Sequence, residues 1–363
     1  MAKNELRQDP LSKDWVIIAG NRKNRPKDVC DPHKKTPTPY FKCPFCPGEE
    51  DKNIEIFRIE NKPNQWVIRS ILNKNPYFEV PSEEKTGIVV KNDLFPSFTP
   101  VGHAEVLIET PYHYKDLVFM EKEEIEKVFE AYYLRYCDLI KDWQEVIIFK
   151  NHGYMAGQSL LHPHSQITAI KEKSPEMKEE EISFLEYYYN HNRCLLCDLS
   201  KIEKLKNKRM VMINEHFIAI CPWASKKPYE VMIIPLRHFS SFADITKEEI
   251  KSLALIFQEI LRKIFVGLGN PSYNFYFRSF QAEKPFYKKF KNRHFYAKIV
   301  PHISIPGGFE ASTEAFVNAV TPEEATEFLK SVDLRKYNFP KMYNFYKKYP
   351  DADIQKIIEK GTV

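Results

Sequence analysis

Short runs of apolar residues, each ending near Pro, Asn or Gly, mark out several β-strands along this chain. Residues 66–72, 104–108, 144–150 and 273–277 are rich in Val, Ile, Leu or aromatic residues and fit this pattern. Between them, residues 123–140 carry apolar positions at helical spacing, and this predicts a helix. A second, acidic helix is predicted at residues 179–189, where the composition changes abruptly. The chain therefore mixes strands and helices.

The order of these elements is repeated. Residues 105–125 align with residues 230–250 at one offset of 125, which matches Glu105 with Glu230 and His113 with His238. One offset through a strand, a loop and a helix indicates an internal duplication. We therefore expect an N-terminal half at 1–172, a C-terminal half at 173–336 and an arm at 337–363. The arm is expected to pack on the body or on a partner subunit.

Composition narrows the class of protein. The chain has 363 residues, of which 43% are apolar, and this is enough for one large core or two ordinary ones. Its 54 basic and 49 acidic residues are mixed along the chain, so we expect no nucleic-acid partner. The N-terminus lacks the apolar core of a signal peptide, and no apolar run is long enough to span a bilayer. No membrane association and a cytoplasmic location are predicted.

Cysteines and histidines form two matching sets. Two of the seven cysteines pair as Cys-x-x-Cys in each half, and in a reducing compartment such pairs are better metal ligands than disulfides. Each set has the two thiolates and two imidazoles of a closed structural zinc site, so about two zinc ions per chain are predicted. Redox or incidental Cys-x-x-Cys pairs are the alternative, and iron in the second site stays open. The expected ligands are Cys43, Cys46, His113, His162, Cys194, Cys197, His238 and His294.

The stretch His162-Pro163-His164-Ser165-Gln166 carries the candidate chemistry. Two histidines two residues apart in a strand project from the same face, about 7 Å apart. In the repeat, His162 is matched by His294, whereas His164 is matched by Tyr296 and Gln166 by Lys298. The second half thus keeps the metal ligand but not the potential nucleophile. One active site per chain is expected.

The His-Pro-His-x-Gln motif, preceded by Asn151, Gly157 and Ser159, resembles the active-site strand of the galactose-1-phosphate uridylyltransferase family in the histidine triad superfamily. Further similar stretches at residues 9–26, 43–48, 73–76 and 308–310 extend the resemblance over most of the chain. The resemblance implies an α+β fold of two duplicated halves, each a mostly antiparallel sheet with helices packed on it. It also implies a homodimer.

The family transfers a nucleoside monophosphate through a covalent nucleotidyl-histidine. By this resemblance, His164 is the nucleophile and Gln166 holds the phosphoryl oxygens. A neutral imidazole can attack an α-phosphorus in line, and the departing sugar phosphate needs little protonation. The residues implied to bind nucleotide and phosphate are Arg22, Arg25, Asn73, Asn151, Gly157 and Ser159. For the two arginines the alternative is a solvent-exposed surface position, and for Asn73 it is the capping of a turn.

The expected function is transfer of UMP from UDP-glucose to a hexose 1-phosphate, as in galactose metabolism, with a nucleotide sugar and a sugar phosphate as partners. Ser304 and Phe316 stand where the family carries a lysine and a glutamine near the hexose phosphate. This departure brings in an alternative, the ADP-glucose phosphorylase branch, which uses inorganic phosphate as acceptor. A non-catalytic nucleotide-binding protein is a second alternative.

Overall fold

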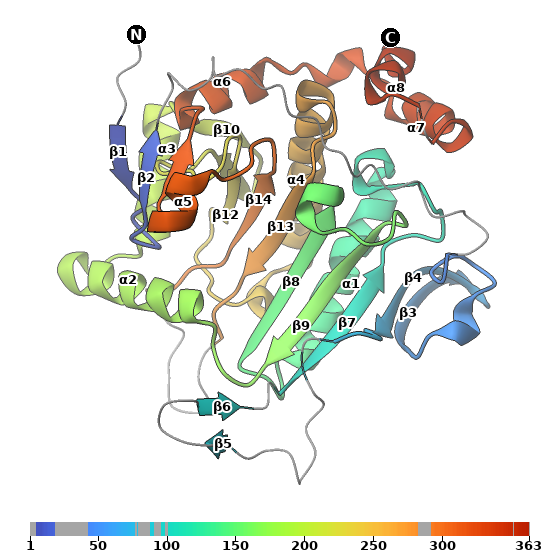
Figure 1. Ribbon diagram of the computed structural model, residues 1–363, viewed down its shortest axis with the longest axis horizontal. Coiled ribbons are helices and arrows are strands. Elements are labelled where there is room, and N and C mark those ends of the chain that lie inside the picture. Colours follow the sequence, from blue (N-terminus) through green and yellow to red (C-terminus); the bar gives the residue numbers. More distant parts are fainter. Residues whose placement is uncertain are drawn as a thin grey trace.

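One antiparallel sheet forms the centre of the computed structural model, which describes residues 5–18, 43–76, 78, 88–90, 96–98, 101–281, 292–350 and 352–362. Within these ranges the sheet has ten strands in the order β10-β11-β12-β14-β13-β8-β9-β7-β4-β3 (Figure 1). The first half supplies β3 (Glu55–Lys62), β4 (Gln65–Leu72), β7 (Gly102–Ile108), β8 (Glu145–His152) and β9 (His164–Ile170). The second half supplies β10 (Met210–Ile213), β11 (Phe217–Ile220), β12 (Val231–Pro235), β13 (Tyr273–Arg278) and β14 (Tyr296–Pro301). The expected duplicated α+β fold is confirmed, and the halves join where β8 pairs with β13.

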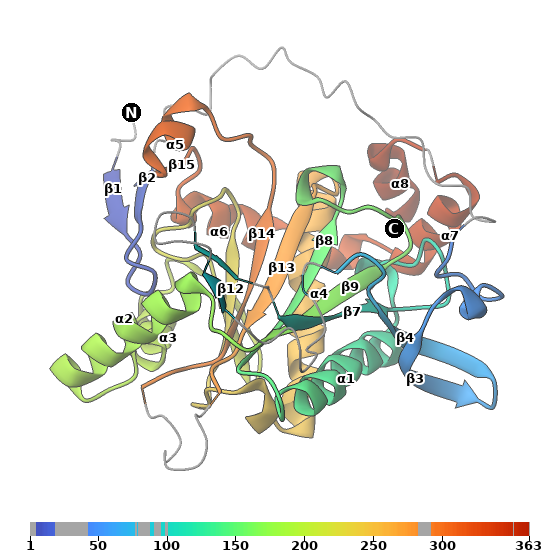
Figure 2. The ribbon, with the colours of Figure 1, turned by 60° about the horizontal axis from the view of Figure 1, so that its bottom comes forward.

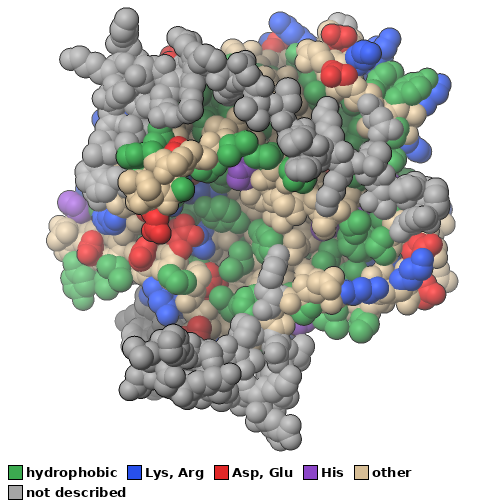
Figure 3. Space-filling view, in the orientation of Figure 1, with side chains coloured by type: hydrophobic (Ala, Val, Ile, Leu, Met, Phe, Trp, Pro, Cys, Tyr) green, Lys and Arg blue, Asp and Glu red, His purple; other side chains and the backbone are tan. Residues whose placement is uncertain are grey.

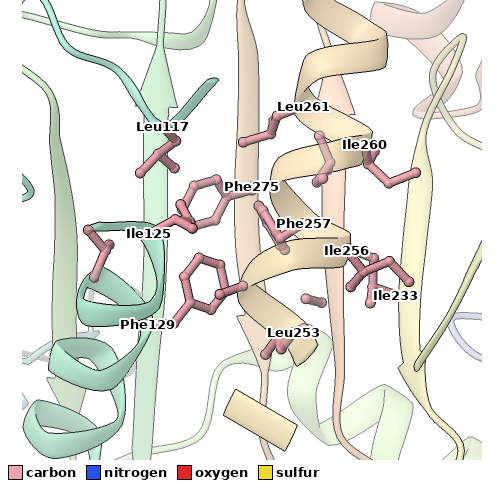
Figure 4. Packing of buried hydrophobic residues seen from close by; sticks show 14 of the residues in the cluster. Leu117, Ile125, Phe129, Ile233, Leu253, Ile256, Phe257, Ile260, Leu261 and Phe275 are labelled. Atoms are coloured by element: carbon pink, nitrogen blue, oxygen red, sulfur yellow. The ribbon is translucent and has the colours of Figure 1, made fainter. Parts of the chain in front are cut away.

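Two equivalent helices cover one face of this sheet. They are α1 (Lys122–Leu139) and α4 (Lys247–Leu268), and α4 begins at a capping box in which the Thr246 hydroxyl accepts from the Glu249 N–H. Phe129 of α1 and Phe257 of α4 pack together with Phe275 of β13 (Figure 4). Burying each such side chain contributes roughly 1.5–3 kcal/mol, so this core fixes the sheet from behind.

The opposite face differs between the halves. In the second half it is covered by α2 (Pro175–His191) and α3 (Leu195–Lys206), whose Phe184 and Leu196 pack on Ile218 and Met232. In the first half, the described residues on that face form a smaller cluster around Cys43, Phe45, Trp66, Val106 and Ile108. The candidate nucleophile His164 lies on this face of the first half.

A small sheet connects the N-terminus to the second half. Strands β1 (Glu5–Gln8) and β2 (Trp15–Ile18) form a hairpin, and β15 (Phe316–Asn318) pairs in parallel with β2. Arg7 donates to Glu323 and to the carbonyl oxygen of Trp223, which fastens the hairpin to α6 (Pro322–Ser331). Figure 2 shows β1, β2 and α5 (Gly308–Thr313) side by side. A separate hairpin joins β5 (Ile88–Val90) and β6 (Pro96–Phe98).

The C-terminal arm packs on the body of the same chain. It contains α7 (Phe339–Lys348) and α8 (Ile354–Gly361), whose Met342 and Ile357 are buried in the main core. The rings of Tyr346 and Phe119 lie 5.8 Å apart, which places α7 against the segment before α1. Of the two expected positions for the arm, the body of its own chain is the one observed.

The register of the sheet corrects the repeat alignment by one residue. Helices α1 and α4 begin at residues 122 and 247, so the offset of 125 is confirmed there. In the strands, however, Ile108 lies opposite His164 while Ile233 lies opposite Ala297, one residue beyond the counterpart Tyr296. The match of Glu105 with Glu230 is therefore wrong. Glu105 faces α1 and binds Arg135, whereas Glu230 faces the other side and binds Lys298.

The surface agrees with a mixed charge distribution. On the face shown in Figure 3, acidic and basic side chains lie intermingled. Across the described part of the chain, none of the helices has the length and apolar character needed to cross a membrane.

Candidate active site and metal clusters

The first Cys2His2 set comes together just before the start of β9. The knuckle that carries Cys43 and Cys46 is held by a hydrogen bond from the Asn53 amide to the Pro44 carbonyl oxygen, 2.7 Å long. The Cys46 Sγ lies 3.3 Å from the Nδ1 of His113 and 3.5 Å from the Nδ1 of His162. The Cys43 Sγ lies 3.7 Å from the same His162 atom, so the four ligand atoms converge.

The spacing of these atoms fits a tetrahedral ion. With zinc bonds of about 2.3 Å to sulfur and about 2.0–2.1 Å to nitrogen, the sulfur–nitrogen edge of a tetrahedron is about 3.6 Å. The observed separations of 3.3–3.7 Å lie around that value. Burial raises the pKa of Cys43, and it raises the pKa of Cys46 to about 12, so thiolates here require a cation. The cluster is therefore suited to hold a metal ion.

The second set has the same geometry on different local structure. Cys194 precedes α3 and Cys197 lies in its first turn, whereas the first pair lies in a proline-rich knuckle. The Cys197 Sγ lies 3.3 Å from the His238 Nδ1 and 3.4 Å from the His294 Nδ1. The structure therefore brings together all eight predicted ligands, as two clusters that could each bind a metal ion.

A backbone carbonyl orients one histidine in each cluster. The Nε2–H of His162 donates to the Thr110 carbonyl oxygen at 2.8 Å, and that of His294 donates to Pro235 at 3.2 Å. This contact leaves Nδ1 as the ligand atom and fixes the plane of the ring.

His164 is the first residue of β9 and is almost fully buried, at 6% exposure. Its Nδ1–H donates to the carbonyl oxygen of His162 at 2.7 Å, which leaves the lone pair on Nε2. The ring of Phe45, from the metal knuckle, lies 5.3 Å from the His164 ring. Burial lowers the pKa of His164 to about 4, and the charge of Lys150 lowers it as well. A neutral imidazole at pH 7 is the form that a nucleophile requires.

Asn151 and Gln166 share the face of the sheet that carries His164. Strands β8 and β9 are antiparallel with Phe149 opposite Gln166, so Asn151, two residues further along, lies beside His164. Gly157 has a φ of +83°, and a Cβ at this position would lie 3.8 Å from the Asn151 Nδ2. The loop after β8 thus returns over Asn151. Ser159 is exposed two residues beyond Gly157.

For Asn73, the structure shows a local contact within a turn. The Asn73 Oδ1 accepts a hydrogen bond from the Asn75 N–H at 2.9 Å, which is the turn-capping alternative considered for this residue. A nucleotide contact for Asn73 stays a prediction. Arg22 and Arg25 lie outside the described residues.

Sequence reasoning missed a buried charge network behind β9. Lys150 is fully buried, and its Nζ lies 2.6 Å from Glu109 and 3.5 Å from Asp116. Glu109 also accepts from Tyr132, at 2.9 Å, and from the Ser165 hydroxyl. A lysine within the apolar run of β8 was the available signal. The network fixes β9 from the helix side, because each buried polar group has a partner.

In the second half, a buried carboxylate occupies the face of the sheet that is equivalent to the His164 face. Arg278 lies opposite Tyr296, as Asn151 lies opposite His164. The Tyr296 hydroxyl donates to Glu180 of α2 at 2.7 Å, and the Arg278 Nε lies 3.2 Å from the same carboxylate. Lys298, the counterpart of Gln166, is paired with Glu230 at 3.0 Å. This face is occupied by ion pairs from its own chain.

The described residues form a duplicated α+β fold with two clusters that could each bind a metal ion, and the buried His164 lies beside the first of them. Models of the galactose-1-phosphate uridyl transferase family match the chain, the N-terminal domain at residues 1–173 and the C-terminal domain at residues 179–338. The chain belongs to this family of nucleotidyltransferases.

Two relatives and two solved structures place it within the family. The chain is 30% identical over 337 residues to ADP-glucose phosphorylase of Arabidopsis thaliana, covering 91% of this chain and 93% of the relative. It is also 30% identical over 352 residues to galactose-1-phosphate uridylyltransferase of Thermotoga maritima, covering 91% and 99%. The crystal structure of the Arabidopsis enzyme with bound ADP-glucose superposes with a TM-score of 0.78 at 28% identity, covering 92% and 100%. A uridylyltransferase structure superposes with 0.66 at 25% identity, covering 91% and 98%.

Proposed function

We propose that this chain transfers a nucleoside monophosphate from a nucleotide sugar through a covalent nucleotidyl-His164. The Nε2 of His164 attacks the α-phosphorus, the bond from that phosphorus to the bridging oxygen breaks, and the hexose 1-phosphate leaves. In the second step a phosphate oxygen of the acceptor attacks the same phosphorus and releases the neutral imidazole. The observation that carries this proposal is the buried His164 ring, whose Nδ1–H is held by a backbone carbonyl so that Nε2 keeps its lone pair.

The residues beside His164 have defined parts in this proposal. Asn151, Gly157 and Ser159 bind the oxygens of the α-phosphate, and the Gln166 amide stabilises their charge without competing for a proton. Arg22, Arg25 and Asn73 are proposed to contact the nucleotide. Zinc held by the first cluster would tie the knuckle to the start of β9 and so fix the aim of His164. The second cluster is proposed to hold zinc as a structural ion.

The leading version of this reaction moves UMP from UDP-glucose to a hexose 1-phosphate. It is supported by the family to which the chain belongs and by its 30% identity over 352 residues to the Thermotoga maritima enzyme. The chain is also proposed to form a homodimer, as the family resemblance implies. A monomer in sedimentation velocity experiments would contradict that part.

The second version uses ADP-glucose as donor and inorganic phosphate as acceptor. It is supported by the higher TM-score to the Arabidopsis ADP-glucose phosphorylase, 0.78 against 0.66 for the uridylyltransferase. Ser304 and Phe316 point the same way, because a lysine and a glutamine near the hexose phosphate are expected of an enzyme that accepts a hexose 1-phosphate. Phe316 lies instead in β15, opposite Val16 of β2.

One experiment separates these versions. The protein is incubated with UDP-glucose or with ADP-glucose, each labelled at the α-phosphate, and acid-labile label on the protein is measured. Label from UDP-glucose that is discharged by a hexose 1-phosphate supports the leading version. Label from ADP-glucose alone, discharged by inorganic phosphate, replaces it with the second. A protein that binds a donor but takes up no label from either would be a non-catalytic nucleotide-binding protein.

A further inference from the structure

One asparagine of the second half, Asn274, contacts a residue of the proposed first-half site. Asn274 of β13 lies directly opposite Asn151 of β8, at the junction of the two halves that Figure 1 shows side by side. Its Nδ2 donates to the Asn151 Oδ1 at 2.8 Å and to the carbonyl oxygen of Ala156 at 3.1 Å. Both hydrogens of the Asn274 amide are therefore directed at residues of the first half.

These contacts fix the polarity of the Asn151 side chain. The Ala156 carbonyl oxygen can only accept, so the Asn274 amide must present its nitrogen on this side. The Asn151 oxygen then faces that nitrogen, and the Asn151 Nδ2 is left on the side of Gly157. An amide held in this way presents N–H donors, not an oxygen, to a bound anion. This is the polarity that a phosphoryl group requires.

A histidine holds the other end of Asn274. His302 follows β14, and its Nε2–H donates to the Asn274 Oδ1 at 2.5 Å. Because a side-chain carbonyl oxygen only accepts, His302 must carry its proton on Nε2. The hydrogen bonds therefore run in one direction, from His302 to Asn274 and from Asn274 to Asn151.

The neighbouring backbone is held by the same part of the second half. The Ser272 carbonyl accepts from the His302 N–H at 2.7 Å, and the Ser272 hydroxyl accepts from the Met155 N–H at 3.2 Å. A Cβ at Gly153 would lie 2.3 Å from that hydroxyl oxygen, so only glycine permits this approach. The loop that leads to Gly157 is thus docked on residues 272–274.

We propose that Asn274 and His302 are positioning residues, by which the second half sets the orientation of Asn151 for the transferred phosphoryl group. This inference rests on the proposed function, in which Asn151 binds that group. Although the second half has lost the nucleophile, it supplies the side chains that aim one phosphate ligand of the first half.

The test measures the first half-reaction alone. Protein is mixed rapidly with saturating labelled nucleotide sugar, and the rate constant for nucleotidyl-protein formation is recorded with metal content and melting temperature. Asn274→Asp keeps the size of the side chain but replaces the donor with a carboxylate oxygen facing two acceptors. We expect the rate constant to fall about 10- to 100-fold, because a small misplacement of a phosphate ligand has effects of that size. Metal content is expected to stay near that of wild type. The melting temperature should fall modestly because hydrogen bonds to the first half are lost, so the rate constants are compared well below it.

Variants of His302 provide a rescue that a merely structural role would not show. In His302→Ala the rate constant should fall in the same direction. In His302→Gln it should recover toward wild type, because a glutamine amide can donate to the Asn274 Oδ1 as the imidazole does. Equal rates in the Ala and Gln variants would contradict the directed hydrogen bond.

A matched control separates positioning from general damage. The amide of Asn214 also donates to a backbone carbonyl, that of Ser252 at 2.9 Å, but it lies between β10 and β11 at the far edge of the sheet. Asn214→Asp should therefore react at the wild-type rate. A wild-type rate in Asn274→Asp, or an equal loss in Asn214→Asp, would overturn the positioning role. Absence of label in the wild-type protein would instead overturn the proposed function, and this inference with it.

Discussion

The two halves of this chain have the same arrangement of strands, helix and Cys2His2 cluster, but they carry different residues on the equivalent face of the sheet. Each half places a Cys2His2 cluster at the start of an equivalent strand, and each packs an equivalent helix on the back of the sheet. In the first half the strand continues with His164 and Gln166, while in the second half the corresponding face carries Tyr296 and Lys298 beneath α2. The two halves therefore share the Cys2His2 clusters and differ in the residues on the face of the sheet beside them.

The carboxylate of Glu180 occupies the second-half face that is equivalent to the proposed site. In the second half, Tyr296 and Arg278, which match His164 and Asn151 in the sheet, both bind this buried carboxylate. The corresponding residues of the first half are proposed to bind a phosphoryl group. An anion from the chain itself thus takes the position that a substrate anion has in the proposed site. In the proposed function these sheet positions bind the substrate in the first half, whereas in the second half they bind a carboxylate of the chain itself.

The largest effect is expected when the first face is made like the second. His164→Tyr introduces the second-half residue, which has no imidazole nitrogen to attack phosphorus. The rate of nucleotidyl transfer should fall by on the order of 10⁴-fold or more, as for loss of other enzymatic nucleophiles. Steady-state turnover with each donor measures this. His216→Ala, which removes a partly exposed histidine of the second half, is the control and should retain activity. Comparable turnover in His164→Tyr and wild type would contradict the assigned nucleophile.

The metal clusters are expected to differ in their effect on catalysis. Cys43→Ser and Cys194→Ser should each lower the zinc content from about two to about one per chain, measured by atomic emission after purification without chelator. Only the first should also lower the transfer rate strongly, by about 10- to 100-fold, because His162 adjoins the nucleophile. Cys194→Ser should mainly lower the melting temperature. Zinc-free wild-type protein, or equal loss of turnover in both variants, would break this distinction.

A smaller effect is expected from the pH dependence of folding. Burial raises the pKa of Glu180 to about 6, although Arg278 opposes this shift. Because the folded state holds this proton more tightly than the unfolded chain, its stabilisation is complete below about pH 4.5 and is lost as the pH rises through about 6. The change in the free energy of unfolding is at most about 2 kcal/mol.

Chemical denaturation at pH 4.5 and at pH 6.5 tests this assignment. On going from pH 4.5 to pH 6.5, the unfolding free energy of Glu180→Gln should fall less, or rise more, than that of wild type, because glutamine cannot titrate. Glu186→Gln is the matched control on the same helix, because Glu186 is exposed and its ion pair with Lys13 is long, at 3.9 Å. An identical pH dependence in Glu180→Gln and wild type would show that another group is responsible.

The sequence predicted the metal-ligating residues more successfully than it predicted the residues that surround them in the fold. The spacing of cysteines and histidines, read through the repeat, predicted both clusters, because metal ligands are few and their chemistry is specific. The strands and α1 followed from their periodicity. The repeat alignment was wrong by one residue in β7 and β12, since apolar residues on both faces of a buried strand leave its register unmarked.

Contacts between distant segments were not predictable. An acidic helix at residues 175–191 gave no sign that Glu180 is buried against Tyr296, because that contact joins segments 116 residues apart. The continuous sheet through β8 and β13 was missed for the same reason. With it, the part played by Asn274 beside Asn151 was missed.

The measurement that tests the central claim most directly is the intact mass of the protein after brief incubation with a nucleotide sugar, followed by peptide mapping. The account predicts one nucleoside monophosphate per chain, acid-labile and carried on His164. It also predicts that this adduct is absent from His164→Ala and discharged by the acceptor. An adduct on another residue, or turnover of the nucleotide sugar without any adduct, would contradict it.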